Sequence, residues 1–283
     1  MPQSADPRRP SDSQRPRAVG LVDDEVVCAW ASWDTLELRS ETGEVRLVAS
    51  PRPEHSFRIH DVRFVAGRYV VCGIGTGIMS HGLWSLDLHE ETWAPPLLER
   101  WSDVGVLAGC HDTPSVLFAD GADVVRWDLA RNAEAGRLPG PDAYAGAFAP
   151  GGILTALAGP RGLVLFDENG EERVHTEWVG AEPTAMAFVG QHAVLTAAFE
   201  GEIRLHDLAS LTPRAATRLD AREIDHLAVS PDGRRVACSG GGVTHLLDTA
   251  TLEPLCAPRE ATAAAFTEDG CVVFGSRGAR WIE

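Results

Sequence analysis

Three histidines in this chain are each followed directly by an aspartate, and these pairs are the first place to look for chemistry. They are His60-Asp61, His111-Asp112 and His206-Asp207. Imidazole and carboxylate groups are common ligands of catalytic metal ions. A metal centre built from such pairs needs further ligands on helices, and the sequence shows no clear helical period. None of the 6 cysteines has CxxC spacing. We therefore expect no metal site and no cofactor.

A glycine-rich stretch suggests phosphate binding at first sight. Residues Gly73-Ile74-Gly75-Thr76-Gly77 resemble a phosphate loop, which directs backbone N–H groups at the start of a helix toward an anion. Here the flanking segments have the pattern of strands, and the chain contains no lysine to reach a phosphate. We interpret residues 73–81 as a loop between two strands. No Gly-x-Ser-x-Gly motif and no Ser–His–Asp arrangement can be recognised.

The elements that would position any site follow a repeat. Short apolar runs end in an aspartate and a turn, most clearly at Val124–Asp128, and the spacing of these aspartates is 39 to 41 residues: Asp87, Asp128, Asp167, Asp207 and Asp248. A period near 40 with several strands per repeat predicts a β-propeller. Ser40 and Ile282 occupy the same position in two further repeats. The sequence thus predicts an all-β, seven-bladed propeller.

The repeat divides the chain into two segments. Residues 1–16 hold prolines at positions 2, 7, 10 and 16 and little that could be buried, so we expect a flexible Pro/Arg-rich arm. Residues 17–283 form the propeller. Its last blade, with strands expected near 262–266, 272–275 and 279–282, is predicted to have only three strands, because prolines in the arm remove donors that a fourth strand needs. The outer strand of blade six is expected at Leu252–Cys256.

The repeats resemble those of the WD-repeat family. Blade six has the turn Ser230-Pro231-Asp232-Gly233 followed by Leu246-Leu247-Asp248, and Trp127-Asp128 is the intact pair that gives the family its name. The resemblance implies a buried His, Ser or Thr, Asp and Trp network in each blade. Blade five comes nearest with Thr196, Glu200 and His206, and blade three offers Asp120 and Trp127. Because the network is incomplete in the other blades, we expect apolar packing to hold this divergent ring. Kelch-type and quinoprotein-type propellers stay open as alternatives, although their own glycine and tryptophan signatures are absent.

The resemblance also predicts a binding face. In the family, the connections between blades and the loops between second and third strands open on one side. This would gather seven residues there: Trp33, His81, Trp101, Trp178, Glu200, Arg222 and Arg277. Exposed tryptophan and arginine are enriched in binding hot spots. The alternative is that Trp101 and Trp178 merely close outer strands against their neighbours.

A second candidate surface is the open edge of blade seven. Without a fourth strand, residues Ala279, Arg280, Trp281 and Ile282 would present unpaired backbone groups, which are a template for strand addition by a partner or by part of the arm near Ser11–Gln14. The alternative is that Arg280 and Glu283 simply keep this edge soluble. The sequence leaves both interpretations open.

Composition restricts the partners. The net charge is −16, with 25 arginines against 41 acidic residues, so the chain lacks the basic stripe that binds phosphate backbones. It has no apolar run of membrane-spanning length and no apolar segment near its start, so we expect a cytoplasmic protein that binds neither nucleic acid nor membrane. The favoured function is a non-catalytic platform for a protein or peptide with a basic surface. An enzyme of the lyase or hydrolase class, with His60, His81, Asp112 or Glu200 converging on the channel mouth, is the alternative.

Overall fold

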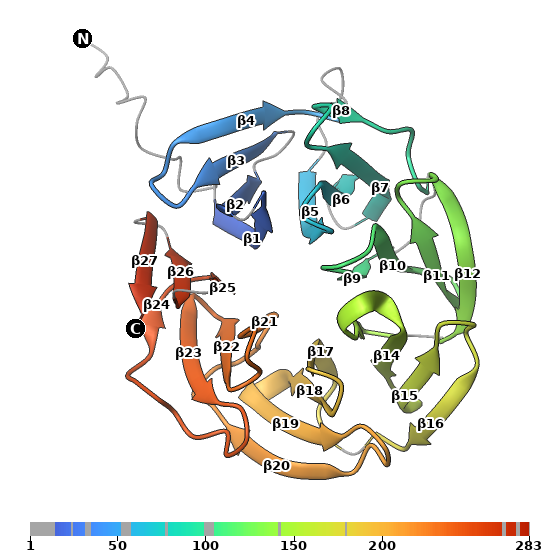
Figure 1. The fold of residues 1–283 in the computed structure, drawn as a ribbon, viewed down its shortest axis with the longest axis vertical. Coiled ribbons are helices and arrows are strands. Elements are labelled where there is room, and N and C mark those ends of the chain that lie inside the picture. Colours follow the sequence, from blue (N-terminus) through green and yellow to red (C-terminus); the bar gives the residue numbers. More distant parts are fainter. Residues whose placement is uncertain are drawn as a thin grey trace.

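The chain folds as a ring of seven antiparallel sheets around a central axis (Figure 1). The computed structural model describes residues 15–23, 25–31, 35–51, 58–76, 79–98, 105–140, 143–178, 180–267, 270–275 and 278–282. In each blade the first strand lies nearest the axis and the last lies at the rim (Figure 1). The predicted seven-bladed, all-β propeller is confirmed.

The strands follow one another from the axis to the rim in every blade. Blades one and two contain β1 (Arg15–Val22), β2 (Glu25–Ala31), β3 (Leu36–Ser40), β4 (Val45–Ala49), β5 (Arg58–Val65), β6 (Tyr69–Thr76), β7 (Met79–Asp87) and β8 (Thr92–Trp93). Blades three and four contain β9 (Val106–Gly109), β10 (Ser115–Asp120), β11 (Asp123–Asp128), β12 (Ala133–Pro139), β13 (Ala145–Phe148), β14 (Leu154–Gly159), β15 (Gly162–Asp167) and β16 (Glu172–Thr176).

The remaining blades continue this order. Blade five contains β17 (Pro183–Val189), β18 (Ala193–Ala198), β19 (Glu202–Asp207) and β20 (Pro213–Arg218), and blade six contains β21 (His226–Val229), β22 (Arg235–Gly240), β23 (Val243–Asp248) and β24 (Arg259–Glu260). Blade seven has the three strands β25 (Ala263–Phe266), β26 (Cys271–Gly275) and β27 (Gly278–Ile282). The prediction of a three-stranded last blade is confirmed. Two short 3-10 turns, η1 (Pro150–Gly152) and η2 (Phe199–Gly201), lie between strands.

Three boundaries differ from those expected. Strand β1 begins at Arg15, inside the segment assigned to the arm, while residues 1–14 lie outside the described residues and their flexibility stays a prediction. Strands β6 and β7 extend into the expected loop at 73–81, as far as the pair Thr76↔Met79. In blade six the outer strand is Arg259–Glu260, and residues 252–256 contribute only a bridge from Pro254 to Leu247.

The repeated aspartates shape the turn after each third strand. Asp128, Asp167, Asp207 and Asp248 each accept a hydrogen bond from a backbone N–H two or three residues further on, at 2.9 to 3.0 Å. An aspartate that bonds its own backbone in this way stabilises a turn. The recurring residue that revealed the repeat is therefore structural. In blade one, Ser40 replaces it and accepts from the N–H of Glu44 at 3.2 Å.

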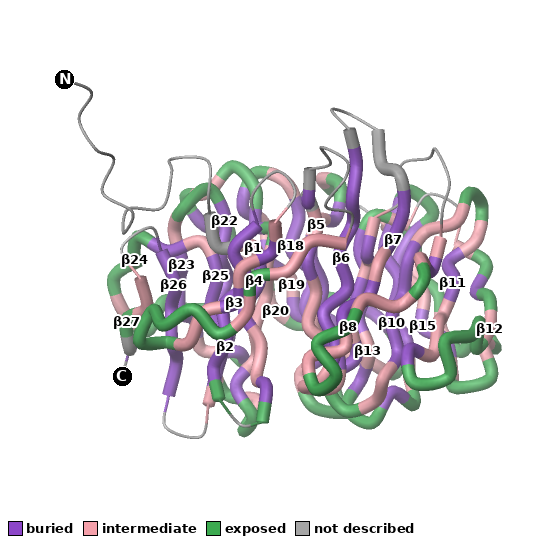
Figure 2. Tube along the Cα trace, turned by 90° about the horizontal axis from the view of Figure 1, so that it is seen from above, coloured by how far each residue is buried: buried purple, intermediate pink, exposed green. Residues whose placement is uncertain are grey.

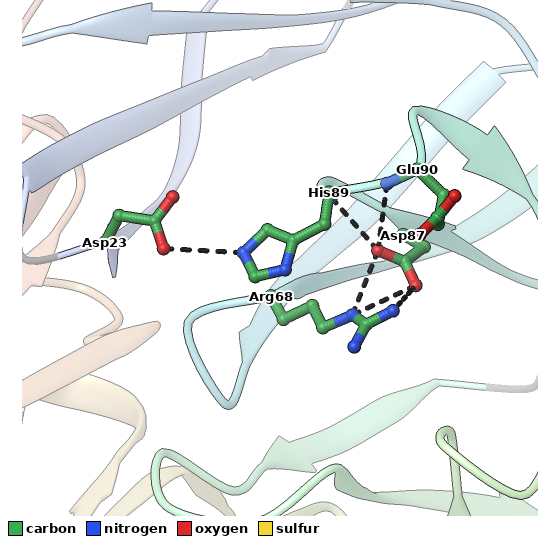
Figure 3. A network of polar contacts seen from close by, with 5 residues as sticks. All are labelled: Asp23, Arg68, Asp87, His89 and Glu90. Carbon is green, nitrogen blue, oxygen red and sulfur yellow. Dashed lines mark hydrogen bonds and ion pairs between the residues drawn. The ribbon is translucent and has the colours of Figure 1, made fainter.

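Asp87 of blade two has an additional role between blades (Figure 3). Its carboxylate accepts from the backbone N–H of His89 at 3.0 Å and from both Nε and Nη2 of Arg68. Partial burial acts to raise the pKa of Asp87, but the hydrogen bonds from Arg68 and the backbone outweigh it and hold the pKa below its usual value. His89 also contacts Asp23 of the first hairpin at 3.4 Å, so this network links blades one and two.

Apolar packing between blades forms the core. Within the described residues there are seven buried apolar clusters, one at each boundary between neighbouring blades. The cluster that closes the ring joins Val19, Cys28 and Trp30 of blade one to Val272 and Phe274 of blade seven. Figure 2 shows the buried residues in the middle of the strands and exposed residues along rim strands such as β4 and β12. Among the described residues, side-chain packing between blades one and seven closes the ring, and no strand belongs to both of these blades.

Candidate functional site

One end of the propeller carries both kinds of connection that the sequence assigned to the binding face. Turn η2 connects the second and third strands of blade five, and residues 219–225 connect blade five to blade six. The N–H of Glu200 donates to the carbonyl of Arg222 at 2.6 Å, and the N–H of Phe199 donates to the carbonyl of Glu182 at 3.1 Å. We call this end the loop face. The structure thus brings Glu200 and Arg222 together.

A depression of about 380 Å³ opens on the loop face of blade five, beside the connection that comes from blade four. Seven residues line it: Ala181, Phe199, Glu200, Glu202, Ala216, Thr217 and Arg218. Glu200 forms an ion pair with Arg218, and Arg204 donates to Glu202 at 2.7 Å through Nη2. The depression therefore combines an apolar wall with three charged groups of both signs, and Arg204 pairs with one of them from outside the lining.

Glu200 is held in an uncommon backbone conformation. Its φ is +64°, whereas blades three and six have glycine at their equivalent turns, with φ of +66° at Gly121 and +60° at Gly241. A residue with a side chain costs on the order of 1 kcal/mol in this region. Its own carbonyl accepts from Arg218 Nε at 3.0 Å, which helps to hold the turn. The strained turn places a carboxylate at the rim of the depression, with most of its side chain exposed.

Trp178 lies beside the depression and fixes the connection from blade four to blade five. Its indole N–H donates to the carbonyl of Ala181 at 2.7 Å. Its ring lies 6.2 Å from the His206 ring, and the guanidinium of Arg204 lies 5.8 Å from it. The side chain is half-buried against the cluster between these two blades. Trp178 therefore positions Ala181 in the wall, and its role in binding stays a prediction.

The other residues assigned to this face are not placed. Trp33, Trp101 and Arg277 lie outside the described residues, and so does the side chain of His81, although its backbone belongs to β7. Sequence reasoning missed Arg218, Glu202 and Phe199. Glu202 and Arg218 alternate with apolar residues as in any strand, and Phe199 lies in turn η2, so their pattern predicts no site. The wall forms only when the connection from the preceding blade lies beside them.

Of the three residues that the resemblance suggests for a polar network in blade five, two form a buried pair. Thr196 Oγ1 lies 3.0 Å from His206 Nε2, and His206 Nδ1 lies 3.0 Å from the carbonyl of Leu211. A carbonyl accepts only, so Nδ1 carries the proton and Nε2 accepts from the threonine. Burial lowers the pKa of His206, which favours this neutral form. Glu200 does not join the pair, because it is bonded to Arg218 on the surface.

Blade three departs from the WD-repeat network as well. Asp120 forms an ion pair with Arg137 at 3.0 Å. Trp127 Nε1 is buried and has no hydrogen-bond partner among the described residues. Asp120 and Trp127 therefore do not form the polar chain that the resemblance suggests. This agrees with a ring held by apolar clusters.

The three histidine–aspartate pairs serve separate structural purposes. Asp61 accepts from Arg63 at 2.7 Å and from the N–H of Val106 at 3.0 Å, and Asp112 accepts from the N–H of Gly151 at 2.6 Å. Asp112 lies in the turn between first and second strands, at the end of the propeller opposite Glu200. These two proposed catalytic groups therefore do not converge. The side chain of His60 is outside the described residues.

The described ranges contain neither a cluster of metal ligands nor a membrane-spanning helix. No three His, Cys, Asp or Glu side chains there are grouped so that they could hold a metal ion. No helix among these residues is long and apolar enough to cross a membrane. The cysteines are all free, and Cys256 is the least buried of them.

His226, at the start of β21, is a group from which we expect a pH dependence of the stability. Its Nδ1 is buried and has no hydrogen-bond partner within the described residues. Burial, and to a lesser extent the positive charge of Arg63, lowers the pKa of His226 to about 4. The unfolded pKa is about 6.5. The native state therefore prefers neutral imidazole, and this stability is present above pH 6.5 and is lost as the pH falls toward 4.

We expect the urea concentration at the unfolding midpoint of the wild-type protein to be lower at pH 5 than at pH 7. The decrease should be smaller in His226→Leu. The variant cannot bind the proton that the unfolded wild-type chain takes up. Burial raises the pKa of the adjacent Asp225, which acts in the opposite direction, so the difference between the two proteins is the informative quantity. An equal fall in both proteins would show that His226 makes no contribution.

Comparison with known proteins shows similarity in structure alone. No protein-family model matches the chain, and no curated protein sequence matches it. The solved structure of U3-55K superposes with a TM-score of 0.72 over 97% of this chain and 93% of that chain, at 15% sequence identity. A chain in the crystal structure of the mitotic checkpoint complex gives 0.72 over 99% and 94%, at 14% identity. Both are WD40 propellers, and at such low identity the similarity concerns the fold. The chain therefore has the seven-bladed β-propeller fold that these two structures share.

Proposed function

We propose that this protein is a non-catalytic interaction platform that binds a protein or peptide with a basic surface through the loop face of blades four and five. The observation that carries the proposal is the 380 Å³ depression, which brings Glu200, Glu202 and Arg218 together with the apolar groups of Phe199 and Ala181. Aromatic residues and arginine are enriched in protein interfaces, whose rims are polar.

The exposed ion pair at the rim can be replaced by an ion pair with a partner. The side chains of Glu200 and Arg218 are 69% and 66% exposed, and ion pairs this exposed contribute little to stability. A lysine or arginine of the partner can therefore replace Arg218 as the neighbour of Glu200 at small cost. The net charge of −16 attracts such a partner from a distance.

Arg222 lies exposed at the same face, where its carbonyl holds the turn of Glu200. Arginine at such a position is able to bond a partner's carboxylates or carbonyls. One of the structural neighbours is part of a mitotic checkpoint complex, which supports a role in protein assembly at the level of the fold. We propose a protein or peptide partner, and neither nucleic acid nor membrane. We also propose a cytoplasmic location, which the free cysteines suit.

We expect Glu200→Arg to reduce recovery of the partner at least tenfold when the tagged full chain is purified from its native cells. The change places two positive groups side by side at the rim and repels a basic partner. Glu168→Arg is the matched control, because it makes the same charge change in the turn after β15, at the opposite end. Recovery of the same partner in equal amounts with both variants would contradict the proposal.

A further inference from the structure

The outer edge of blade seven has no neighbour among the residues that the structure describes. In the other six blades the third strand pairs with a fourth, whereas β27 pairs only with β26. Strand β27 lies at the rim of its blade, and the next rim strand around the ring is β4 of blade one (Figure 1). An unpaired edge is a template for another strand.

The register shows which backbone groups point outward. Gly275 and Gly278 are paired across a two-residue connection, so they form a hydrogen-bonded pair, and such pairs alternate along the ladder. Arg280 and Ile282 therefore bond β26, while Ala279 and Trp281 direct their N–H and C=O groups to the open side. The carbonyl of Phe274, opposite Ala279, accepts from Thr262 on the other side of β26, as this alternation requires.

Rim strand β4 is unusually apolar on the side that faces this edge. Val48 and Val45 are 60% and 47% exposed. They lie opposite Glu37 and Arg39 in the register. The Arg39 guanidinium lies 5.0 Å from the Trp30 ring, and Trp30 belongs to the cluster shared with blade seven. Paired residues share a face of the sheet, so both valines face blade seven.

Other blades place different residues at these two positions. The counterparts of Val48 in blades three, four and five are Arg137, His175 and Ala216, and those of Val45 are Glu134, Glu172 and Pro213. All six are exposed. None of these six is a β-branched aliphatic residue, whereas both positions hold exposed valines in blade one, beside the blade whose fourth strand is absent from the described residues. In blade two the counterpart of Val45 is Trp93, which is partly buried against the cluster shared with blade one.

The charge of Arg280 indicates which residue type an added strand would carry on its other face, the one on the side of blade six. Ala279 packs toward blade one and Ile282 toward blade six, so Arg280 lies on the side of blade six. Arg280 is exposed, and no carboxylate of the described chain forms an ion pair with it, in a protein of net charge −16. A residue directly opposite Arg280 on an added strand shares its face, and a carboxylate fits there.

We propose that an extended segment of a partner protein adds to β27 as the fourth strand of blade seven. It bonds the outward groups of Ala279 and Trp281, packs apolar side chains toward Val45 and Val48, and places an acidic residue opposite Arg280. The recognised sequence thus alternates apolar, acidic, apolar. This surface is separate from the depression on the loop face, so either proposal can fail alone.

The test uses a phage-displayed library of random peptides and the full chain. The library is first depleted on Ala279→Pro, which removes one outward N–H and no bond to β26, and is then selected on the wild-type protein. We expect alternating peptides with a central acidic residue, which bind at least tenfold more weakly to Val48→Arg and to Arg280→Glu. Ile153→Arg, at another exposed apolar residue, is the control and should bind normally.

Two results would overturn this proposal. The first is recovery of no peptide above background, or of peptides that Val48→Arg and Arg280→Glu do not affect, with melting temperatures confirming that the variants are folded. The second is slow hydrogen exchange at Ala279 and Trp281 in the free chain. If that protection is independent of concentration, a segment of the chain itself fills the edge, and if it grows with concentration, a second copy does.

Discussion

Replacing Gly240 with alanine is expected to destabilise the fold by about 3 kcal/mol or more, because the new methyl group has no space. Gly240 ends β22, and a Cβ built on it lies 1.8 Å from the carbonyl oxygen of Glu223 and 2.8 Å from Cα of Ile224. These are backbone atoms, which no side-chain rotation can remove. The connection between blades five and six would have to move outward, and Ile224, which is fully buried between those blades, would move with it.

Urea denaturation of the two proteins measures this effect, with Gly136→Ala as the matched control. Gly136 lies in rim strand β12, and a Cβ built there meets nothing within 4 Å. Alanine at that position should leave the midpoint unchanged or raise it slightly, because the unfolded chain loses freedom. Equal midpoints for Gly240→Ala and Gly136→Ala would show that the backbone contact at Gly240 does not exist in solution.

His206→Ala is expected to cost about 3 kcal/mol, the second large effect. The imidazole is 3% exposed, and its removal leaves a cavity, an unpaired carbonyl at Leu211 and an unpaired hydroxyl at Thr196. Leu211 has a φ of +54°, and this bond helps to hold its turn together with the backbone bond from the N–H of Leu211 to the carbonyl of Asp207. Loss of the ring also removes a neighbour of Trp178, and the wall of the depression should loosen.

A double-mutant cycle with Thr196→Val separates the polar pair from the cavity. We expect Thr196→Val to cost about 1 kcal/mol in the wild-type protein and close to nothing in His206→Ala, since the hydroxyl then has no partner. His192→Ala, at an exposed histidine of the same blade, is the control and should have little effect. Equal costs of Thr196→Val in both backgrounds would refute the hydrogen bond between Thr196 and His206.

The sequence predicted the ring well because the repeated signal is local. An aspartate that bonds the backbone a few residues on needs no distant partner, so its spacing reports the blades directly. The predicted position of the outer strand of blade six was wrong for a related reason. Residues 252–256 are apolar like a strand, but Leu252 adopts a φ of +58° and its N–H donates to the carbonyl of Asp248. The turn uses these residues, and the strand starts later.

Glycines misled the interpretation of blade two. Residues 73–77 have the composition of a loop, yet Gly73, Ile74, Gly75 and Thr76 all pair with β7. Pairing with a neighbour thus overrides the local preference of glycine. The candidate sites were harder still to predict from the sequence, because they depend on which blades are adjacent. Glu200 and Arg222 could be assigned to one face by resemblance, but the exposed side of Val48 has meaning only once blade seven is known to lie beside blade one.

The joint between blades one and seven has a kinetic consequence. The other six joints unite segments about one repeat apart, whereas this one unites residues 19–30 with residues 263–279. Closing the longer loop costs about 1.6 kcal/mol more in chain entropy. Contacts of such long separation are slow to form. We therefore expect the blades to assemble first as an open arc, and the ring to close in the last and slowest step of folding.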